Sequence, residues 1–266
     1  MLEFGGEALV LTHDMLVEGV HFLPEQDPAD VAWKLVATNI SDLASKGAEP
    51  VGVLLGYMLG YMLGKDDARF LEGLSEALNA YNVPLLGGDT VGGSGPQAMG
   101  LTAIGRATHR PVPSRSGAKA GDALWITGKV GAAMVGLEAL RSGSGDSSAY
   151  RRPQARLSEG IALAPQVTAM MDVSDGLLLD AMRMADASGI TFAIDSAAVP
   201  IATPEARRAE ALRWGDDYEL LFTLPYGTAP AVPATLIGQA LARQNAPLLL
   251  DGKRLEAGDS PGFLHR

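Results

Sequence analysis

Short apolar runs that end in an aspartate beside Gly, Ser or Thr recur along this chain. The pattern places Asp89, Asp175 and Asp216 next to small or hydroxylated residues and Asp14 two positions after Thr12, and Asp42 adds a fifth carboxylate within a helical pattern. An N-cap or a turn would explain each aspartate taken singly. Together they favour an α/β chain, because polar side chains at strand ends form the functional site in such folds.

The first half of the chain alternates strand and helix patterns. The run EALVLTHD over residues 7–14 predicts a strand, and periodic apolar residues between an N-cap at Asp27 and a glycine at position 47 predict a helix over 28–46. Later patterns predict a helix over 66–81, a strand over 83–86 that leads into Gly-Gly-Asp-Thr, and a strand over 98–107.

The second half follows a break in composition. Residues 108–121 are rich in Pro, Gly, Ser and basic side chains and predict a domain boundary, which divides the chain into residues 1–110 and 111–266. Beyond it we expect strands over 123–127, 168–173 and 220–224, with helices that end at Leu140 and Gly189. These patterns predict an N-terminal α/β domain with a mixed sheet and a C-terminal α+β domain.

Charge and composition exclude several classes of function. Lys and Arg total 21 against 31 Asp and Glu, and the net charge of −10 disfavours a surface that binds nucleic acid through its phosphates. The chain has no cysteine, which excludes disulfides and thiolate chemistry. No window of about 18 apolar residues predicts a membrane span, and the first four residues lack the features of a signal peptide. We expect a cytoplasmic protein that binds neither nucleic acid nor membrane.

Carboxylates gathered at a partly buried site require cations. Asp42 borders the apolar stripe of its helix, where an unpaired carboxylate is costly. Oxygen ligands select Mg²⁺ or Mn²⁺, and Mg²⁺ commonly joins a few carboxylates to substrate phosphates. The Gly-Lys pairs at 64–65 and 128–129 lack the flanking residues of a P-loop, and the glycine-rich stretch 93–98 precedes a strand and contains a proline. The residues therefore predict a metal-dependent phosphate enzyme without a standard nucleotide-binding motif.

Three basic side chains are open to two interpretations. A lone histidine is more often packed or exposed than a ligand, which applies to His13. His21 follows soon after Asp14 and is equally consistent with a site residue. By composition Arg115 is a solvated charge of the linker, whereas a functional Arg115 would clamp a nucleotide phosphate.

Six stretches of the chain resemble the thiamine-monophosphate kinases, a family in the superfamily of aminoimidazole-ribonucleotide synthetase and selenophosphate synthetase. The acidic motifs are shared with the wider superfamily, whereas VEGVHF and DYELLF are typical of the kinase. The stretches occur in family order and cover nearly the whole chain: LTHDMLVEGVHF (11–22), NISDLASKGAEP (39–50), LLGGDT (85–90), SRSGAKAGD (114–122), MDVSDGLLLD (171–180) and GDDYELLF (215–222).

The resemblance implies an aminoimidazole-ribonucleotide-synthetase-like fold, a homodimer formed through the N-terminal sheet, and ATP with several Mg²⁺ ions in the cleft between the domains. It implies no catalytic side chain beyond those that position substrates and hold metal. The residues implied by position are Thr12, His13, Asp14, Asp42, Asp89, Asp172 and Asp175 for metal, Gly88, Asp89, Arg115 and Ser174 for ATP, and His21, Asp216 and Phe263 for thiamine monophosphate.

The sequence departs from the family pattern in three places. The family's Gly-Asp-Asp-Ala-Ala segment, upstream of the first matched strand, has no counterpart here, so we expect one metal carboxylate to be missing. The glutamate that begins the family's GEDYEL motif is Asp216, which is one methylene shorter. A tandem copy of Gly-Tyr-Met-Leu over 56–63 falls where the family has one strand and a loop.

The activity implied by the resemblance is phosphorylation of thiamine monophosphate to thiamine diphosphate by direct in-line transfer from ATP, the last step of thiamine diphosphate biosynthesis. The acceptor phosphate is already anionic, so the transfer requires neutralisation of charge and no strong base. Two alternatives remain open: another ATP-dependent synthetase of the superfamily, and a catalytically silent nucleotide-binding dimer.

Overall fold

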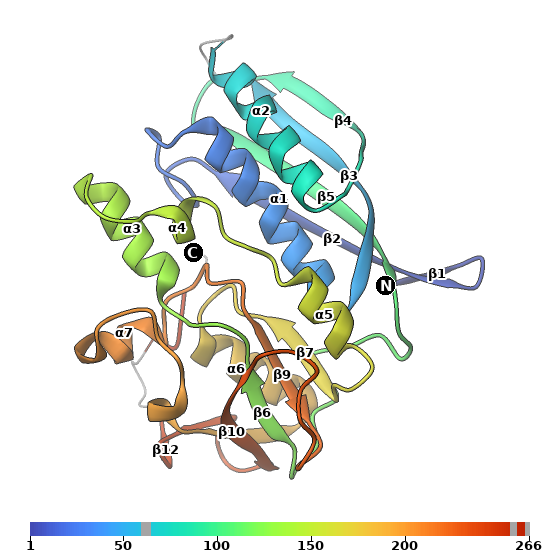
Figure 1. Cartoon of the computed structure of the whole chain (residues 1–266), viewed down its shortest axis with the longest axis vertical. Helices are drawn as coiled ribbons and strands as arrows, with labels where there is room; N and C mark the ends of the chain where they lie inside the picture. Colours follow the sequence, from blue (N-terminus) through green and yellow to red (C-terminus); the bar gives the residue numbers. More distant parts are fainter. Residues whose placement is uncertain (60–64, 256–259, 264–266) are drawn as a thin grey trace.

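The computed structural model describes every residue except 60–64, 256–259 and 264–266. Its described strands form two sheets, one in each half of the chain (Figure 1). The first sheet has the order β1-β2-β5-β3-β4 and consists of β1 (Leu2–Phe4), β2 (Glu7–Val17), β3 (Ala48–Leu59), β4 (Leu85–Gly92) and β5 (Ala98–Ala107). The second has the order β12-β11-β8-β10-β6-β9-β7 and consists of β6 (Ala123–Ile126), β7 (Ala169–Asp172), β8 (Ile190–Ile194), β9 (Leu220–Leu224), β10 (Thr235–Ala242), β11 (Leu248–Leu250) and β12 (Lys253–Arg254).

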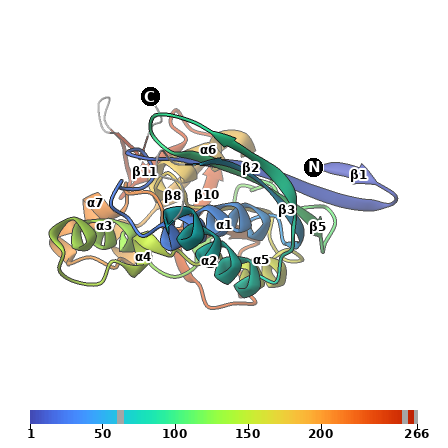
Figure 2. The ribbon, with the colours of Figure 1, turned by 90° about the horizontal axis from the view of Figure 1, so that it is seen from above.

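Helices cover these sheets and complete a two-domain α/β fold, as the sequence predicts. In the first half, α1 (Pro28–Ala44) and α2 (Lys65–Ala80) lie side by side on one face of the sheet (Figure 2). The second half contains α3 (Ala132–Ser142), α4 (Ser148–Arg151), α5 (Leu157–Leu163), α6 (Leu177–Ser188), α7 (Arg208–Ala211) and the 3₁₀ helices η1 (Ser196–Ala198) and η2 (Glu205–Arg207). Across the described ranges, we find no helix with the length and apolar character that a membrane span needs.

Local sequence explains the limits of α1. At its start, the Asp27 carboxylate accepts a 2.9 Å hydrogen bond from Ala29 N, as expected of an N-cap. The helix ends at Ala44 and not at residue 46, because Lys46 N and Gly47 N bond to carbonyls three residues back, in a tighter turn. Its apolar stripe is buried against the sheet, so α1 contributes a large part of the hydrophobic core of the first half.

Strands of the first sheet extend further than the sequence predicts. β2 continues past Asp14 because its ladder with β5 runs along most of its length. β4 includes the Gly-Gly-Asp-Thr motif over 87–90, which we expected to follow a strand over 83–86. Parallel pairing with β3 continues through the motif and keeps it extended. The predicted end of the strand at residue 86 is therefore wrong.

Other boundaries lie close to their predicted positions. β5 and β9 coincide with the strands expected over 98–107 and 220–224. α6 ends at Ser188, next to the Gly189 at which the helix was expected to end, and Gly189 forms a left-handed cap with a φ of 67°. The first Gly-Tyr-Met-Leu copy forms the end of β3, whereas the second, over 60–63, lies outside the described residues.

The two halves meet where α5 packs against α1. A Cβ placed on Gly160 would lie 2.0 Å from Ala44 O, so the helices approach at a distance that only glycine permits. Nearby, Trp33 Nε1 donates a 2.8 Å hydrogen bond to Pro153 O, in the segment between α4 and α5. This segment therefore fixes the second half against α1.

Candidate active site

A cavity of about 940 Å³ lies between the two halves of the chain. Its walls come from β2 and the loop after it, from α1, and from the segments that follow β7 and precede β9. The predicted site residues that line it are Asp14, His21, Asp42, Asp172, Ser174, Asp175, Asp216 and Phe263. The fold thus brings together side chains that are far apart in the sequence.

The first half supplies the carboxylates of Asp14 and Asp42, and a hydrogen bond to a neighbouring residue fixes each aspartate. Thr12 Oγ1 donates a hydrogen bond to the carboxylate of Asp42, and Asp14 N donates a 3.1 Å hydrogen bond to Asn39 Oδ1. Thr12 and Asp14 share one face of β2 because alternate residues of a strand point to the same side. That face is turned towards α1, so β2 and α1 together present carboxylates to the cavity.

The second half supplies Asp172, at the end of β7. Its buried carboxylate accepts a 2.7 Å hydrogen bond from Ser41 Oγ. Burial raises the pKa of Asp172 to about 7, and the neighbouring Asp42 carboxylate acts in the same direction. A pKa this high means that the ionised form is unfavourable without a compensating cation.

These residues suit a hard divalent cation. Asp14, Asp42, Asp172 and Asp175 line one cavity, and carboxylate oxygens are ligands that Mg²⁺ prefers. Within the part of the chain that the structure describes, no three acidic or histidine side chains converge on one point as a formed metal site requires. Burial and the neighbouring Asp42 carboxylate raise the pKa of Asp172, so added positive charge would favour its ionised form. The donor set therefore fits Mg²⁺.

Asp180 holds the turn that carries Ser174 and Asp175. It is fully buried and accepts hydrogen bonds from Ser174 N at 3.1 Å and Asp175 N at 2.9 Å. Arg183 Nη1 donates to Asp180 at 2.8 Å and also to the Asp175 carboxylate. Burial raises the pKa of Asp180 to about 6. Sequence reasoning missed Asp180, although a carboxylate within the apolar run of 177–181 was an available signal.

Asp216 is fixed between a buried lysine and a tyrosine. Lys34 Nζ donates a 2.7 Å hydrogen bond to Asp216 Oδ2, and Tyr218 OH donates one of 2.9 Å to Oδ1. Asp216 and Tyr218 have φ angles of 66° and 52°, in the left-handed region that residues other than glycine rarely adopt. Backbone strain that is held by specific contacts is typical of a functional loop.

Lys34 also contacts His21, one of the two histidines that the sequence offered as site residues. Lys34 Nζ donates a 3.1 Å hydrogen bond to His21 O, and Tyr150 OH donates one of 3.2 Å to the same oxygen. The ammonium lies 4.1 Å from the centroid of the Tyr150 ring. On the histidine ring, Nδ1 accepts a 3.0 Å hydrogen bond from Val17 N. Sequence reasoning missed Lys34, for which a lysine inside the buried stripe of a helix was the available signal.

His13 does not line this cavity. It lies on the face of β2 opposite Asp14, where its Nδ1 is 2.9 Å from Thr102 Oγ1. The two residues diverge because β2 continues as a strand through this motif, and adjacent strand residues point to opposite faces. A metal-ligand role for His13 stays a prediction.

The predicted ATP residues Gly88, Asp89 and Arg115 also lie away from the cavity walls. The first two are exposed on β4, at the edge of the first sheet. Arg115 is exposed in the segment between the halves. Burial lowers the pKa of Lys46, Asp172 opposes that shift, and Arg115 lies close enough to add to it. Lys46 therefore places positive charge near the Asp172 carboxylate, and the ATP assignments stay predictions.

Comparison with known proteins defines the class of this protein. Residues 1–107 match the N-terminal domain of AIR synthase related proteins, and residues 119–244 match the C-terminal domain of the same proteins. The chain is therefore a two-domain protein of the AIR synthase related group. Hydrogenase maturation protein HypE shares this fold, with a TM-score of 0.80 at 20% identity over 97% of this chain and 92% of its own.

Curated relatives narrow the class to one family. The thiamine-monophosphate kinase of Escherichia coli strain K12 is 36% identical over 93% of this chain and 86% of its own length. The structure of AaThiL complexed with AMPPCP and TMP aligns with a TM-score of 0.87 at 30% identity, over 96% of this chain and 87% of that one. The enzyme structure from Stenotrophomonas maltophilia K279a aligns with a TM-score of 0.84 at 31% identity, over 94% of this chain and 87% of that one. This chain belongs to the thiamine-monophosphate kinase family.

Proposed function

We propose that this chain transfers the γ-phosphoryl group of ATP to the phosphate of thiamine monophosphate, which yields thiamine diphosphate and ADP. The observation that carries the proposal is the placement of Asp14 and Asp42 from the first half, and of Asp172 and Asp175 from the second, around one cavity. The family relationship supports the choice of both substrates. We propose the metal-holding role for these carboxylates and Thr12; His13 and Asp89, the other predicted metal ligands, lie outside the cavity walls, and their role stays a prediction.

The transfer needs neutralisation of charge and no strong base. A bond forms between an oxygen of the acceptor phosphate and the γ-phosphorus of ATP, and the bond from that phosphorus to the bridging oxygen breaks, so that ADP leaves. Because the acceptor oxygen is already anionic, no side chain has to remove a proton. When bound, Mg²⁺ neutralises phosphate charge and stabilises the transferring group. Asp42 and Asp172 would hold the metal ion at the junction of the two halves.

The two substrates are assigned to different parts of the site. We place ATP with Gly88, Asp89, Arg115 and Ser174, and thiamine monophosphate with His21, Asp216 and Phe263. Two observations support direct contact between these two parts: Phe263 lines the same cavity as Ser174, and Phe263 N donates a 2.8 Å hydrogen bond to Asp175 O. The use of ATP also supports the expected cytoplasmic location. The division at residue 110 and the expected lack of nucleic-acid and membrane binding stay predictions.

Exposed apolar side chains on the outer face of the first sheet support the proposal of a homodimer. Leu11 and Met15 on β2 and Leu54 on β3 are 47%, 52% and 41% exposed. They lie on the sheet face opposite α1, together with His13. Exposed apolar side chains gathered on one face are typical of an association surface. We propose that two copies of the chain associate through this face.

The test is the formation of thiamine diphosphate from thiamine monophosphate and ATP by the purified chain, with and without Mg²⁺. We expect product only when Mg²⁺ is present. Bound ATP without product would contradict the proposal and favour a silent nucleotide-binding protein. Turnover of an amide substrate instead, in a panel that includes the substrates of the superfamily's synthetases, would favour a synthetase.

A further inference from the structure

The ammonium group of Lys34 is enclosed at the junction of the two halves. The side chain is 1% exposed, although it carries a charge. A buried charge persists only when partners compensate for the lost hydration. Here the partners are the Asp216 carboxylate at 2.7 Å, the His21 carbonyl at 3.1 Å and the Tyr150 ring at 4.1 Å.

All three partners of Lys34 belong to the cavity wall. Asp216, His21 and Tyr150 line the cavity, whereas Lys34 lies behind them. Lys34 belongs to α1, Tyr150 to α4, and Asp216 to the segment before β9, so the ammonium joins elements of both halves. The position of the cavity wall therefore depends on this one cation.

The carboxylate of Asp216 has little freedom of its own. One of its oxygens accepts from Lys34 and the other accepts from Tyr218, while its backbone φ of 66° is in the left-handed region. A backbone of this kind persists only when its surroundings hold it. Loss of the ammonium would release one carboxylate oxygen and one anchor of the strained loop.

We propose that Lys34 is a positioning residue for thiamine monophosphate. It fixes the Asp216 carboxylate and the His21 loop in one arrangement and does not itself contact the substrate. The inference rests on the proposed function, because it takes Asp216 and His21 as substrate residues. It adds that α1, a helix of the first half, fixes the acceptor site from the side that faces away from the cavity.

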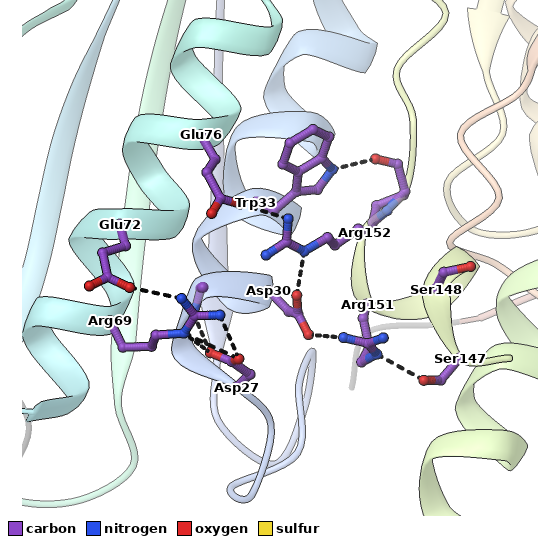
Figure 3. Close-up of polar contacts among 12 residues, drawn as sticks. Asp27, Asp30, Trp33, Arg69, Glu72, Glu76, Ser147, Ser148, Arg151 and Arg152 are labelled. Carbon is purple, nitrogen blue, oxygen red and sulfur yellow. Dashed lines mark hydrogen bonds and ion pairs between the residues drawn. The ribbon is translucent and has the colours of Figure 1, made fainter. Parts of the chain in front are cut away.

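A second buried ion pair joins the same two halves away from the cavity, and it provides a matched control (Figure 3). Asp30 precedes Lys34 by four residues and so shares its face of α1. Its carboxylate is 2% exposed and accepts hydrogen bonds from Arg151 and Arg152. Arg152 also donates a 2.7 Å hydrogen bond to Glu76. This pair links the halves but lies outside the cavity wall.

The experiment compares Lys34→Met with Arg152→Met in the full chain. Steady-state kinetics with each substrate varied in turn, and calorimetric binding of thiamine monophosphate, are measured for both variants and the wild type. We expect Lys34→Met to lower kcat/KM for thiamine monophosphate on the order of 10²-fold, because the acceptor loses its alignment. We expect its KM for ATP to stay within about twofold of the wild type. Arg152→Met should leave both parameters near the wild-type values.

A double-substitution cycle tests whether Lys34 acts through Asp216. In the double variant, kcat/KM for thiamine monophosphate should fall by less than the product of the two separate fold-losses. The reason is that Lys34→Met and Asp216→Asn each remove the same interaction. The double variant contains no unpaired charge at this position, so it remains informative if circular dichroism shows that Lys34→Met alone does not fold. In that case the double variant should match Asp216→Asn in its affinity for thiamine monophosphate.

The outcomes separate this inference from the proposed function. If the wild type is active and Lys34→Met keeps its kcat/KM for thiamine monophosphate, the inference is wrong and the proposed function stands. Equal losses in Lys34→Met and Arg152→Met, or fully multiplicative effects in the cycle, would also overturn it. If the wild type neither binds nor phosphorylates thiamine monophosphate, the proposed function fails and the inference fails with it.

Discussion

Ser41 Oγ donates a 2.7 Å hydrogen bond to Asp172 Oδ2, and this bond joins α1 of the first half to the end of β7 in the second. Asp42 follows Ser41 in the chain, so the same contact brings two carboxylates together at the cavity. Burial, and then the Asp42 charge, raise the pKa of Asp172 to about 7. The candidate metal site therefore forms only where the two halves meet.

Asp42→Asn should abolish most of the activity and leave the fold intact. The amide keeps the size of the side chain and can still accept the hydrogen bond from Thr12, but it removes one negative charge from the proposed metal site. We expect kcat to fall on the order of 10²-fold or more, as when a group that stabilises transferring charge is lost. Steady-state assays at saturating Mg²⁺ and thermal unfolding measure the two effects.

The matched control for Asp42→Asn is Asp66→Asn. Asp66 is an exposed aspartate in the first turn of α2. It should keep wild-type turnover, because its carboxylate lies outside the cavity wall. Near-normal turnover in Asp42→Asn, or an equal loss in both variants, would contradict the assignment of Asp42 to the metal site.

The metal-free chain should lose stability through Asp172 as the pH rises. The folded-state pKa of about 7 lies above the ordinary value of about 4, so the folded state favours the protonated carboxyl. The free energy of unfolding therefore falls as the pH rises from about 4 to about 7, because the unfolded state releases its proton first. The variant Asp172→Asn lacks this titration.

Thermal unfolding in EDTA measures the effect of Asp172. We expect Asp172→Asn to become progressively more stable than the wild type between about pH 4 and pH 7. Added Mg²⁺ should stabilise the wild type near neutral pH and act much less on the variant. A constant difference in melting temperature over this range, or equal stabilisation by Mg²⁺, would show that Asp172 is not at the metal site.

Asp180→Ala should destabilise the second half and misplace the turn that carries Ser174 and Asp175. The substitution leaves two buried backbone N–H groups without their acceptor and removes one partner of Arg183. We expect a loss of about 2–4 kcal/mol in the free energy of unfolding. Urea denaturation gives this value, and the assay for thiamine diphosphate gives the accompanying loss of turnover.

Asp186→Asn controls for the loss of a carboxylate from the same helix. Asp186 forms a 2.8 Å ion pair with Arg243, but its side chain is 55% exposed. Exposed pairs of this kind contribute little, so the variant should lose less than about 1 kcal/mol. Similar losses of unfolding free energy in Asp180→Ala and Asp186→Asn would contradict the stabilising role that the hydrogen bonds of Asp180 indicate.

Leu11→Lys with Leu54→Lys should convert the proposed dimer into a monomer. Both side chains lie on the outer face of the first sheet, where a charge would have to be buried on association. Sedimentation equilibrium at several protein concentrations measures the state. Leu71→Lys is the control, because Leu71 is 59% exposed on α2, away from that face. A wild-type chain that is monomeric at all concentrations would contradict the proposal.

The sequence revealed those site residues that can be recognised from their neighbours along the chain. Asp42, Asp175 and Asp216 stand beside small or hydroxylated residues, Asp14 follows Thr12 by two positions, and all four line the cavity. It missed Lys34 because a lysine within an apolar helical stripe carries no local sign of its partner. That partner, Asp216, lies 182 residues away along the chain.

The error at residues 87–90 has a related cause. Two glycines before an aspartate favour a turn by local preference. Parallel pairing with β3 supplies ladder hydrogen bonds that keep the motif extended. Pairing between strands is a non-local interaction, so local propensity could not reveal it.

The sequence by itself determined the four longest helices, about half of the described strands and the identity of most of the site carboxylates, because caps, periodicity and turn residues act over a few positions along the chain. Only the tertiary structure decided which of these groups meet. Ser41 and Asp172 are 131 residues apart in sequence and form one hydrogen bond. Such contacts depend on how α1 packs against the second half, and that packing is set by buried shape and charge from both halves.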